Sequence, residues 1–325
     1  KVTVRDYGRG IPLGKVVDVV SKINTGAKYD SGVFQKCVGL NGVGTKAVNA
    51  LSNHFKVQAF RDGYTKMAEF KKGILVNDPR QSKTSEKNGT LVEFEPDSSM
   101  FKHYHFIFEY LDDLMWNYAF LNAGLTINYN GRKFYSKDGL LDLLKQKSAG
   151  EDIRYPIIHL TGNDIEVTLT HGNQYGEEYY SFVNGQNTTQ GGTHLAPFRE
   201  GMVRGVRERF KKDYDAADIR ASIIGAIAVR VQEPVFESQT KTKLGSLNMS
   251  PDGVAIKNFV GDFVAKELEI YLHKNPVVAD ALEKRILQSE RERKDIAGIK
   301  KLANERAKKA NLHNRKLRDC RFHFD

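Results

Sequence analysis

The apolar residues of this chain recur with the two-residue period of strands in some stretches and with the three-to-four-residue period of helices in others. In the first part of the chain the two periods alternate without a regular strand–helix–strand order. The expected elements there are strands over residues 2–4, 56–60, 67–70 and 90–95 and helices over residues 15–23 and 46–51. This mixed order favours an α+β layer over a βαβ ladder.

A helix over residues 106–121 is predicted next, with an aromatic stripe that we expect to pack in the core. A strand over residues 125–129 then meets Asn130-Gly131, a dipeptide typical of a tight hairpin. Residues 146–152 are polar and follow no period, which places a domain boundary there. The aromatic stripe of the helix over residues 106–121 consists of Tyr110, Leu114, Tyr118 and Leu121.

The second part of the chain is expected to form a second domain that ends in one long helix. Its earlier predicted elements are strands over residues 165–170 and 178–184, a helix over 195–210 and a helix-to-strand segment over 219–231. The long, charged helix is predicted over residues 276–310, with a thin apolar seam that is interrupted near residues 290–293. A heptad coiled coil is the alternative, but the interruption favours a single stem helix packed on its own domain. The seam residues are Val278, Leu282, Ile286, Ile296, Ile299 and Leu302.

Composition agrees with a protein of two domains that has no membrane span. The chain has 325 residues, 40% of them hydrophobic, and no apolar run approaches the roughly 20 residues that a spanning helix needs. Cys37 and Cys320 have no metal-binding spacing around them, so we expect free thiols in a reducing cytoplasm. The net charge of +10 favours a polyanionic partner.

Two glycine-rich segments carry the strongest candidate chemistry, DYGRGIP at residues 6–12 and GLNGVG at residues 39–44. The first places the carboxylate of Asp6 directly after a predicted strand, where it can accept a hydrogen bond from a base amino group. The second leads into a helix, so its backbone N–H groups can hold phosphate oxygens. Each motif alone is weak, since Asp-x-Gly is also a common Asx turn. Together they predict a nucleotide pocket.

In this order the two motifs resemble those of the GHKL ATPases, and the continuation into VNALS narrows the resemblance to the B subunits of bacterial type IIA topoisomerases. Three later segments agree with that family: NGTLVEF at residues 88–94, QGGTH at 190–194 and QTK at 239–241. The resemblance implies an α+β protein, with a GHKL (Bergerat-type) α/β sandwich ATPase domain followed by a βαβ-type transducer domain and a long C-terminal helix. The implied ranges are 1–147 for the ATPase domain, 148–313 for the transducer and 314–325 for the start of a linker into a TOPRIM domain.

The resemblance also assigns roles to side chains. Asp6 would bind the adenine amino group, and Thr90 would join the network around adenine, although a β-branched residue also suits a strand by itself. The candidate catalytic residues Lys241 and Gln239 would reach the γ-phosphate from the transducer. Lys28 would neutralise phosphate charge from a lid, with a solvated loop lysine as the equal alternative. The implied ATP-binding set is Asp6, Gly8, Gly10, Ile11, Pro12, Lys28, Gly39, Leu40, Asn41, Gly42, Val43, Gly44, Thr90 and Lys241.

Two positions depart from the usual family pattern. Asn41 stands where bacterial B subunits usually have His, and Phe34 stands where a Tyr often contacts the nucleotide. The family's general-base Glu and Mg²⁺-binding Asn lie upstream of the Asp-x-Gly motif and would precede Lys1. We therefore expect a fragment without the catalytic base and without a metal ligand of its own. Residues 314–320 resemble the linker that enters the TOPRIM domain, so the cleavage domain is also expected to be absent.

The function implied by the resemblance is ATP-driven DNA gate closure and strand passage by an ATP-hydrolysing topoisomerase of the bacterial cytoplasm, with ATP and Mg²⁺ as cofactors. The implied partners are DNA, the A subunit in a heterotetramer, and a second copy of the B subunit on ATP binding. The Asn41 loop favours topoisomerase IV over gyrase. Two alternatives stay open: another GHKL ATPase, such as a chaperone or mismatch-repair protein, and a catalytically silent nucleotide-binding module. The basic runs 204–212 and 300–309 are either sequence-independent contacts to DNA phosphates or solvated helix faces.

Overall fold

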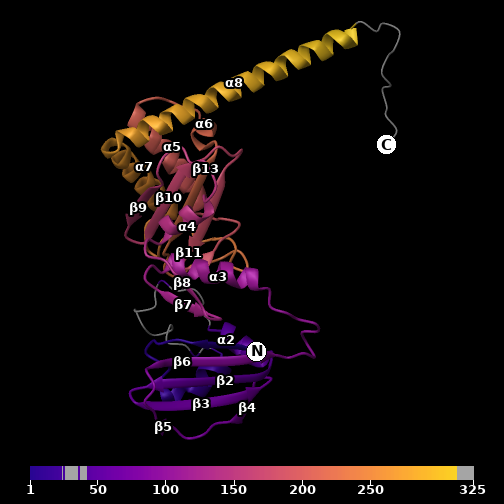
Figure 1. The fold of residues 1–325 in the computed structure, drawn as a ribbon, viewed down its shortest axis with the longest axis vertical. Helices are drawn as coiled ribbons and strands as arrows, with labels where there is room; N and C mark the ends of the chain where they lie inside the picture. The colour runs from indigo at the N-terminus through magenta and orange to yellow at the C-terminus, as the bar shows by residue number, and fades with distance from the viewer. Residues whose placement is uncertain (24, 26–35, 37–41, 313–325) are drawn as a thin grey trace. The chain divides into compact units, whose positions relative to one another are not determined.

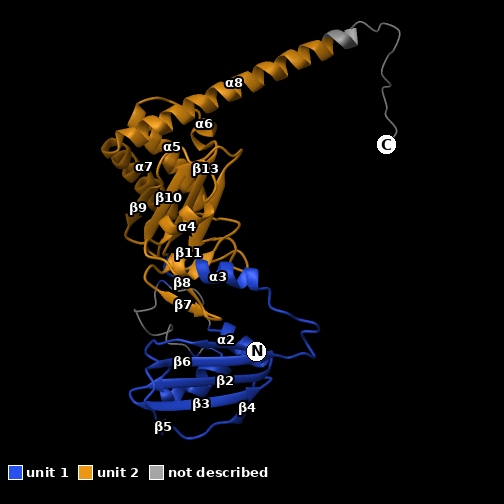
Figure 2. Ribbon diagram, in the orientation of Figure 1, with its two compact units in different colours: residues 1–116, 231–234 blue, residues 117–230, 235–325 orange. Residues whose placement is uncertain are grey.

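The structure, a computed structural model, describes residues 1–23, 25, 36 and 42–312 (Figure 1). The chain divides into two compact units, residues 1–116 with 231–234 and residues 117–230 with 235–325 (Figure 2). This division lies before the polar stretch 146–152. Helix α4 (Leu140–Lys147), which reaches into that stretch, already belongs to the second unit. The backbone N–H of Leu140 donates to Glu166 Oε1 there, at 2.9 Å. The domain limits at 147 and 313 stay predictions.

The first unit is built on an antiparallel sheet in the order β1-β6-β2-β3-β4, with β5 paired to β3. The predicted strands of this part all fall within it, and the turn at Asp62-Gly63 joins β2 to β3 with positive φ at both residues. The strands are β1 (Val2–Arg5), β2 (Ser52–Arg61), β3 (Tyr64–Lys71), β4 (Ile74–Asn77), β5 (Ser82–Lys83) and β6 (Gly89–Pro96).

Short helices cover one face of this sheet. They are the 3-10 turn η1 (Leu13–Lys15), α1 (Val16–Ser21) and α2 (Gly44–Ala50). The two-residue period of β2 buries alternate apolar side chains against α1, which is the reason that the strand forms here. The buried core of the unit is Val16, Val20, Phe55, Val57, Ala59, Ala68 and Phe70.

Helix α3 (Phe108–Leu121) forms where the sequence predicts a helix, but its aromatic stripe does not pack in the core. Tyr110 is 70% exposed and Leu114 is 42% exposed, so the expected core packing of the stripe is wrong. The buried side chains of α3 are Ala119 and Phe120, at its C-terminal end. These two are adjacent in sequence, so the helix is buried over its last turn rather than along one face.

The hairpin predicted at Asn130-Gly131 is confirmed. Strands β7 (Thr126–Tyr129) and β8 (Arg132–Tyr135) pair antiparallel around the two turn residues. Asn130 has φ +47° and Gly131 has φ +79°, and two consecutive positive φ values are what a tight two-residue hairpin turn requires.

The second unit contains a five-stranded sheet in the order β12-β11-β13-β10-β9. Its β11 and β13 run parallel, and α5 (Leu195–Phe210) and α6 (Ala216–Arg220) connect them, which is a βαβ crossover. The predicted helix over 195–210 and the helix-to-strand segment over 219–231 are thereby confirmed. The strands are β9 (Ile158–Gly162), β10 (Ile165–His171), β11 (Glu178–Val183), β12 (Gln186–Asn187) and β13 (Ile223–Val229).

Helix α7 (Ile256–Lys274) packs closely against α5, although the sequence analysis assigned no element to its residues. The approach depends on two glycines of α5. A Cβ on Gly201 would lie 2.7 Å from the carbonyl oxygen of Gly261, and a Cβ on Gly205 would lie 2.7 Å from that of Ala265. Backbone meets backbone at this crossing, so a methyl group at either glycine would push the helices apart.

The long C-terminal helix is confirmed as α8 (Pro276–Leu312). Its first part packs on the second unit, with Leu282 and Ile286 almost completely buried. Beyond the predicted interruption the seam is exposed, since Ile296, Ile299 and Leu302 are each more than half exposed. The single stem helix is therefore packed on its own unit only over its first part. Among the described residues, no helix combines the length and the apolar character needed to cross a membrane.

Candidate functional site

Asp6 lies directly after β1, where the antiparallel pairing with β6 continues for one more residue. The Asp6 N–H donates to the carbonyl oxygen of Thr90 at 2.9 Å. Its side-chain Oδ1 accepts from the N–H of Thr90 at 3.2 Å and from the N–H of Gly8 at 2.8 Å. The second of these is the Asx turn that the sequence also allowed. Both bonds use Oδ1, and no described residue donates to Oδ2, which leaves that oxygen of an exposed carboxylate available to a ligand.

The glycines around Asp6 are required by close backbone approach. Gly10 has φ +77°, and a Cβ there would lie 2.4 Å from the carbonyl oxygen of Phe60. Gly89 has φ +140°, and a Cβ there would lie 2.0 Å from the carbonyl oxygen of Asp6. These two positions therefore admit only glycine. At Gly8 a Cβ would lie 3.2 Å from Asp6 Oδ1, so this glycine belongs to the Asx turn itself.

Arg5 is a site residue that the sequence analysis missed. Its Nη2 donates to the carbonyl oxygen of Lys87 at 2.7 Å, and its Nη1 donates to the carbonyl oxygen of Asp6. The guanidinium also lies 4.3 Å from the ring centroid of Phe60 and 4.8 Å from that of Tyr7. Arg5 thus fastens the Asp6 turn to β2 and to the loop before β6. The signal in the sequence that could have identified Arg5 was its position directly before the Asp-x-Gly motif.

Ile11 and Pro12, expected to form an apolar wall, differ in burial. Ile11 is half-buried and packs against the core of the first unit, whereas Pro12 is exposed. The carbonyl oxygen of Pro12 accepts from the N–H of Lys15 at 2.8 Å, which begins the 3-10 turn before α1. The apolar surface beside Asp6 is therefore continuous with the core of the unit at Ile11.

Part of the predicted phosphate loop is described. Gly42 has φ +56°, and Val43 and Gly44 lead directly into α2 as predicted. Four other members of the ATP-binding set, and Phe34, lie outside the described residues. These four are Lys28, Gly39, Leu40 and Asn41.

Lys46, on the first turn of α2, is a second residue that the sequence analysis missed. The residue is only 8% exposed, yet its Nζ donates only to backbone carbonyl oxygens within the described residues, those of Gly42 at 2.6 Å and Thr25 at 3.2 Å. Burial lowers the pKa of Lys46 from its ordinary value, and no carboxylate of the described residues pairs with it. A desolvated cation next to a glycine loop is suited to an anionic group. Its position two residues after Gly44 was the signal available in the sequence.

Gln239 and Lys241 belong to the second unit, on the hairpin over residues 235–246. Gln239 is exposed, and the N–H of Lys241 donates to the carbonyl oxygen of Ser238 at 3.0 Å. Lys241 has φ +57°, an uncommon conformation for a residue other than glycine. Within the described residues its Nζ has no ion pair. Nearby Lys243 differs, because its Nζ lies 2.9 Å from Glu237 Oε1.

The two basic runs differ in how far their charges are neutralised. In the first, Arg204 pairs with Asp262 at 2.6 Å and Lys212 pairs with Glu283 at 2.7 Å. In the second, the described lysines and arginine have no ion pair within the described residues and are exposed. These are Lys300, Lys301, Arg306 and Lys308. The second run is therefore the better surface for phosphate contacts.

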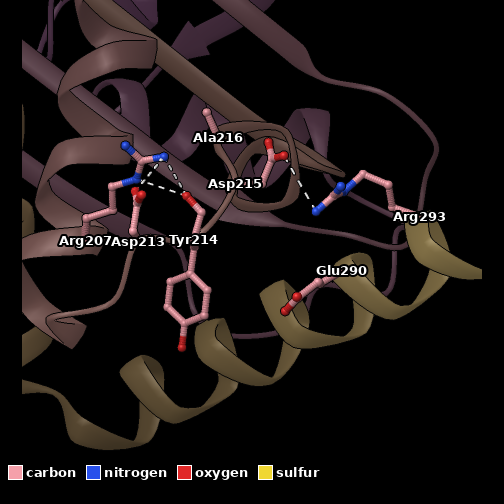
Figure 3. Close-up of a pocket in the computed structure, with 7 residues that line it drawn as sticks. All are labelled: Arg207, Asp213, Tyr214, Asp215, Ala216, Glu290 and Arg293. Atoms are coloured by element: carbon pink, nitrogen blue, oxygen red, sulfur yellow. Dashed lines mark hydrogen bonds and ion pairs between the residues drawn. The ribbon is translucent and has the colours of Figure 1, made fainter.

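A cavity of about 510 Å³ lies in the second unit, between the end of α5, the segment before α6, and α8 (Figure 3). Arg207 donates there to the carbonyl oxygen of Tyr214 at 2.9 and 2.6 Å, and Arg293 pairs with Asp215 at 3.6 Å. Its lining carries both signs of charge, and its cations already have partners, so it does not resemble a nucleotide pocket. Among the described residues no group of three or more His, Cys, Asp or Glu side chains is placed to hold a metal ion.

Comparison with known proteins gives a consistent result. The family model for DNA gyrase B matches residues 132–302. The B subunit of DNA topoisomerase 4 from Borreliella burgdorferi is 46% identical over 324 residues, covering 100% of this chain and 53% of that protein. The B subunit of DNA gyrase from Treponema denticola is 30% identical over 323 residues, covering 89% of this chain and 50% of that protein. The crystal structure of the 43K ATPase domain of Thermus thermophilus gyrase B in complex with an aminocoumarin matches with a TM-score of 0.70 at 25% identity, over 92% of this chain and 83% of that one.

The chain spans about half the length of these two curated relatives, 53% and 50%. The expected α+β architecture is confirmed by its likeness to the Thermus thermophilus domain. The family model alone covers more than half of the chain, and the alignment with the Borreliella burgdorferi protein covers all of it. The chain therefore belongs to the DNA gyrase B family of type IIA topoisomerase B subunits.

Proposed function

We propose that this chain is the ATP-binding and transducer region of the B subunit of a bacterial type IIA topoisomerase. The observation that carries the proposal is the state of Asp6, whose Oδ1 is held by two backbone N–H groups while Oδ2 stays available. Such a carboxylate is fixed in orientation before a ligand arrives, which lowers the entropic cost of binding. The similar Thermus thermophilus domain is an ATPase domain in complex with an aminocoumarin, which supports a ligand site in this fold.

In the proposed site, Asp6 Oδ2 accepts a hydrogen bond from the adenine amino group. The close approach at Gly10 and Gly89 keeps side chains away from the base, and Ile11 supplies an apolar surface beside it. Thr90 takes part through its backbone, which fixes Asp6, and its hydroxyl is expected to join the water network around the base.

The phosphates are proposed to bind at the loop before α2, where backbone N–H groups of Gly42, Val43 and Gly44 are donors and Lys46 supplies a positive charge. Lys28, Gly39, Leu40 and Asn41 complete this part of the proposal. The residues present suit ATP, since Lys46 is a partly desolvated cation that pairs with no carboxylate of the described residues. Mg²⁺ is proposed to bind with the nucleotide, where it would offset charge on the phosphate groups.

Lys241, with Gln239 beside it, is proposed to contact the γ-phosphate from the second unit. A lysine without an ion pair can exchange water for a phosphate oxygen without breaking an existing salt bridge. Because ADP lacks this phosphate, hydrolysis would release Lys241, and the second unit would be free to move. In the whole protein this release would couple to DNA gate closure and strand passage.

The proposed partners are DNA, the topoisomerase A subunit in a heterotetramer, and a second copy of the B subunit on ATP binding, in the bacterial cytoplasm. DNA would contact the exposed basic run of α8 between Lys300 and Lys308. We favour topoisomerase IV over gyrase because the Borreliella burgdorferi topoisomerase 4 protein is 46% identical, against 30% for the Treponema denticola gyrase protein.

The test of this function is nucleotide binding by an Asp6→Asn variant. An amide presents a donor where the adenine amino group needs an acceptor, so affinity for ATP analogues and for ADP should fall about tenfold or more in calorimetry. Asp62→Asn is the matched control, because Asp62 is an exposed turn residue of the same unit with φ +54°, which asparagine also tolerates. Equal nucleotide affinities for the two variants would contradict the assignment of Asp6.

A further inference from the structure

The hairpin that carries Lys241 is hydrogen-bonded to the QGGTH segment. We define the lysine hairpin as residues 235–246 and the Gly-Gly loop as residues 188–194. The N–H of Gln190 donates to the carbonyl oxygen of Thr242 at 3.0 Å. The N–H of Leu244 donates to the carbonyl oxygen of Gly191 at 3.1 Å, and the N–H of Thr193 donates to that of Leu244 at 3.2 Å. Three backbone bonds therefore join the two segments.

Gly192 is the point of closest approach between them. Its φ is +133°, and a Cβ there would lie 2.4 Å from the carbonyl oxygen and 2.5 Å from the nitrogen of Leu244. Both of these atoms belong to the backbone, so they cannot move aside as a side-chain end can. Any residue other than glycine must therefore displace the lysine hairpin from the loop.

A side chain closes the base of the hairpin. Thr193 Oγ1 donates to the carbonyl oxygen of Ser246 at 2.6 Å, and Ser246 Oγ accepts from the N–H of Val235 at 2.8 Å. The N–H of Gly245 donates to the carbonyl oxygen of Val235 at 2.8 Å. Leu244, between these bonds, is completely buried. The two ends of the hairpin are thereby fixed on the Gly-Gly loop.

The Gly-Gly loop is itself anchored in the core of the second unit by His194. This histidine is completely buried, and its Nε2 lies 2.6 Å from Ser181 Oγ on β11. Ser181 Oγ also lies 2.6 Å from Thr188 Oγ1, and the N–H of Thr188 donates to the carbonyl oxygen of Ser181 at 2.8 Å. Both ends of the loop are therefore attached to one strand of the sheet.

These contacts lie at the base of the hairpin, and within the described residues its tip, residues 238–241, has no hydrogen bond to the Gly-Gly loop. Lys241 is held at the tip with φ +57° by the bond from its N–H to Ser238. Its Nζ has no ion pair within the described residues, whereas Lys243 is held by Glu237 at 2.9 Å. The position of Lys241 therefore depends on the hairpin base, and the base is hydrogen-bonded to the Gly-Gly loop.

We propose that the Gly-Gly loop is a positioning clamp for Lys241: Gly192 and Thr193 hold the base of the lysine hairpin so that the ammonium group at its tip meets the γ-phosphate. This inference rests on the proposed role of Lys241. It assigns a purpose to QGGTH that requires no contact between its residues and the nucleotide. They are positioning residues, and loosening them should weaken the recognition of the third phosphate while leaving the rest of the nucleotide site unchanged.

The experiment measures affinities for ADP and for a non-hydrolysable ATP analogue, by calorimetry with the full-length natural protein. Lys241→Ala should lower affinity for the analogue about tenfold, as expected for the loss of a charge-assisted hydrogen bond, and should leave ADP affinity unchanged. Gly192→Ala and Thr193→Val should give the same selective loss, and Thr193→Ser, which keeps the hydroxyl, should restore it. Gly192→Ala combined with Lys241→Ala should lose no more than Lys241→Ala alone.

Two controls separate positioning from general damage. Gly150→Ala also places a Cβ at a positive φ of +91°, but with nothing within 4 Å, so it should change neither affinity. Amide hydrogen exchange at Leu244 should accelerate in Gly192→Ala and Thr193→Val, because its N–H bonds to Gly191. If Gly192→Ala does not fold, the Thr193→Val and Thr193→Ser pair decides the question.

The outcomes distinguish the two proposals. If Lys241→Ala keeps the preference for the analogue over ADP, the proposed γ-phosphate role of Lys241 is wrong and the clamp is wrong with it. If Lys241→Ala loses the preference while Thr193→Val retains it, the clamp alone is overturned. An equal loss of ADP and analogue affinity in Thr193→Val would also overturn the clamp, since it would indicate damage beyond the hairpin.

Discussion

Arg293 on α8 donates from Nε and Nη2 to the two carboxylate oxygens of Asp218 on α6, at 2.9 and 2.7 Å. Asp218 is only 2% exposed, and Ser289 Oγ donates to it at 3.4 Å. This bidentate pair lies at the interruption that the sequence shows in the apolar seam of α8. The packed part of the helix thus ends in a charged pair, and residues 294–308 after it are exposed.

Replacing Arg293 should destabilise the second unit. Arg293→Ala leaves the buried carboxylate of Asp218 without this bidentate partner, so the free energy of unfolding should fall measurably in a denaturant titration. Arg291→Ala is the matched control, because Arg291 is an exposed neighbour on the same helix without an ion pair in the described chain. A similar, small effect of the two variants would mean that α8 does not depend on the pair.

Lys46→Met should separate nucleotide affinity from stability. The methionine keeps most of the apolar length of the side chain and removes a desolvated charge that no carboxylate of the described chain neutralises, so stability should be kept or slightly raised. Affinity for ADP and for an ATP analogue should fall about tenfold, because the proposed phosphate contact is lost. Calorimetry and thermal unfolding measure the two effects. Lys71→Met, at an exposed lysine of β3, should change neither; unchanged affinity in Lys46→Met would remove Lys46 from the site.

Stability should decline in mild acid because two buried histidines stay neutral in the fold. Burial lowers the pKa of His171 and of His194 to about 4, from 6.5. His171 Nε2 lies 2.7 Å from the carbonyl oxygen of Ile219, so that nitrogen carries the proton and Nδ1 accepts from the Tyr155 hydroxyl. The charge of Arg285 further disfavours the protonated form of His171.

The unfolded chain therefore binds more protons than the folded one between pH 6.5 and about 4, and the free energy of unfolding falls as the pH falls through that window. Each histidine accounts for roughly 3 kcal/mol of the total change. Denaturant titrations at several pH values should show a shallower dependence for His194→Gln than for the natural chain, once the loss from repacking at neutral pH is subtracted. A dependence unchanged by this variant would show that His194 is not held neutral.

DNA affinity should depend on α8 more than on α5. Lys300→Gln combined with Lys301→Gln removes two exposed charges that have no partner in the described chain, so the slope of log affinity against log salt should decrease by about two. Arg204→Gln with Lys212→Gln removes the same charge, but both residues are already paired with carboxylates. Fluorescence anisotropy with duplex DNA at several salt concentrations measures both slopes. A larger decrease for the second pair would reassign the DNA surface to the basic run 204–212 at the end of α5.

Local sequence patterns were sufficient to predict elements whose structure depends on neighbouring residues in the chain. Helix α5 has the predicted bounds 195–210, and the positive φ values of Asn130 and Gly131 follow from the dipeptide alone. No element was predicted for α7, although its large buried residues recur every four positions, at Ile256, Val260, Val264, Leu268 and Leu272. At α3 periodicity predicted the helix but not its burial, because the aromatic residues recur at helical spacing while staying exposed.

The candidate site could be predicted only in part. The Asp6 carboxylate follows from the motif, but its bond to Thr90 joins residues far apart in the chain, and no local pattern encodes that register. Lys241 has the composition and surroundings of an ordinary surface lysine, and only the resemblance to the topoisomerase family marked it. The roles of Arg5 and Lys46 depend on backbone carbonyl groups, which a sequence of side chains does not reveal.

The pairing of β1 with β6 has a consequence for how the site forms in time. Val2 lies opposite Phe94, and Arg5 lies opposite Leu91, so β1 joins the sheet through one neighbour that is synthesised much later. Loop closure over such a separation costs more entropy than the local β2–β3 hairpin, and contacts of this kind form late in folding. Of the two bonds that orient the Asp6 carboxylate, the one from Thr90 can form only with this pairing. The proposed adenine contact of Asp6 therefore requires this pairing, and nucleotide present during refolding should stabilise the finished sheet without accelerating the earlier steps.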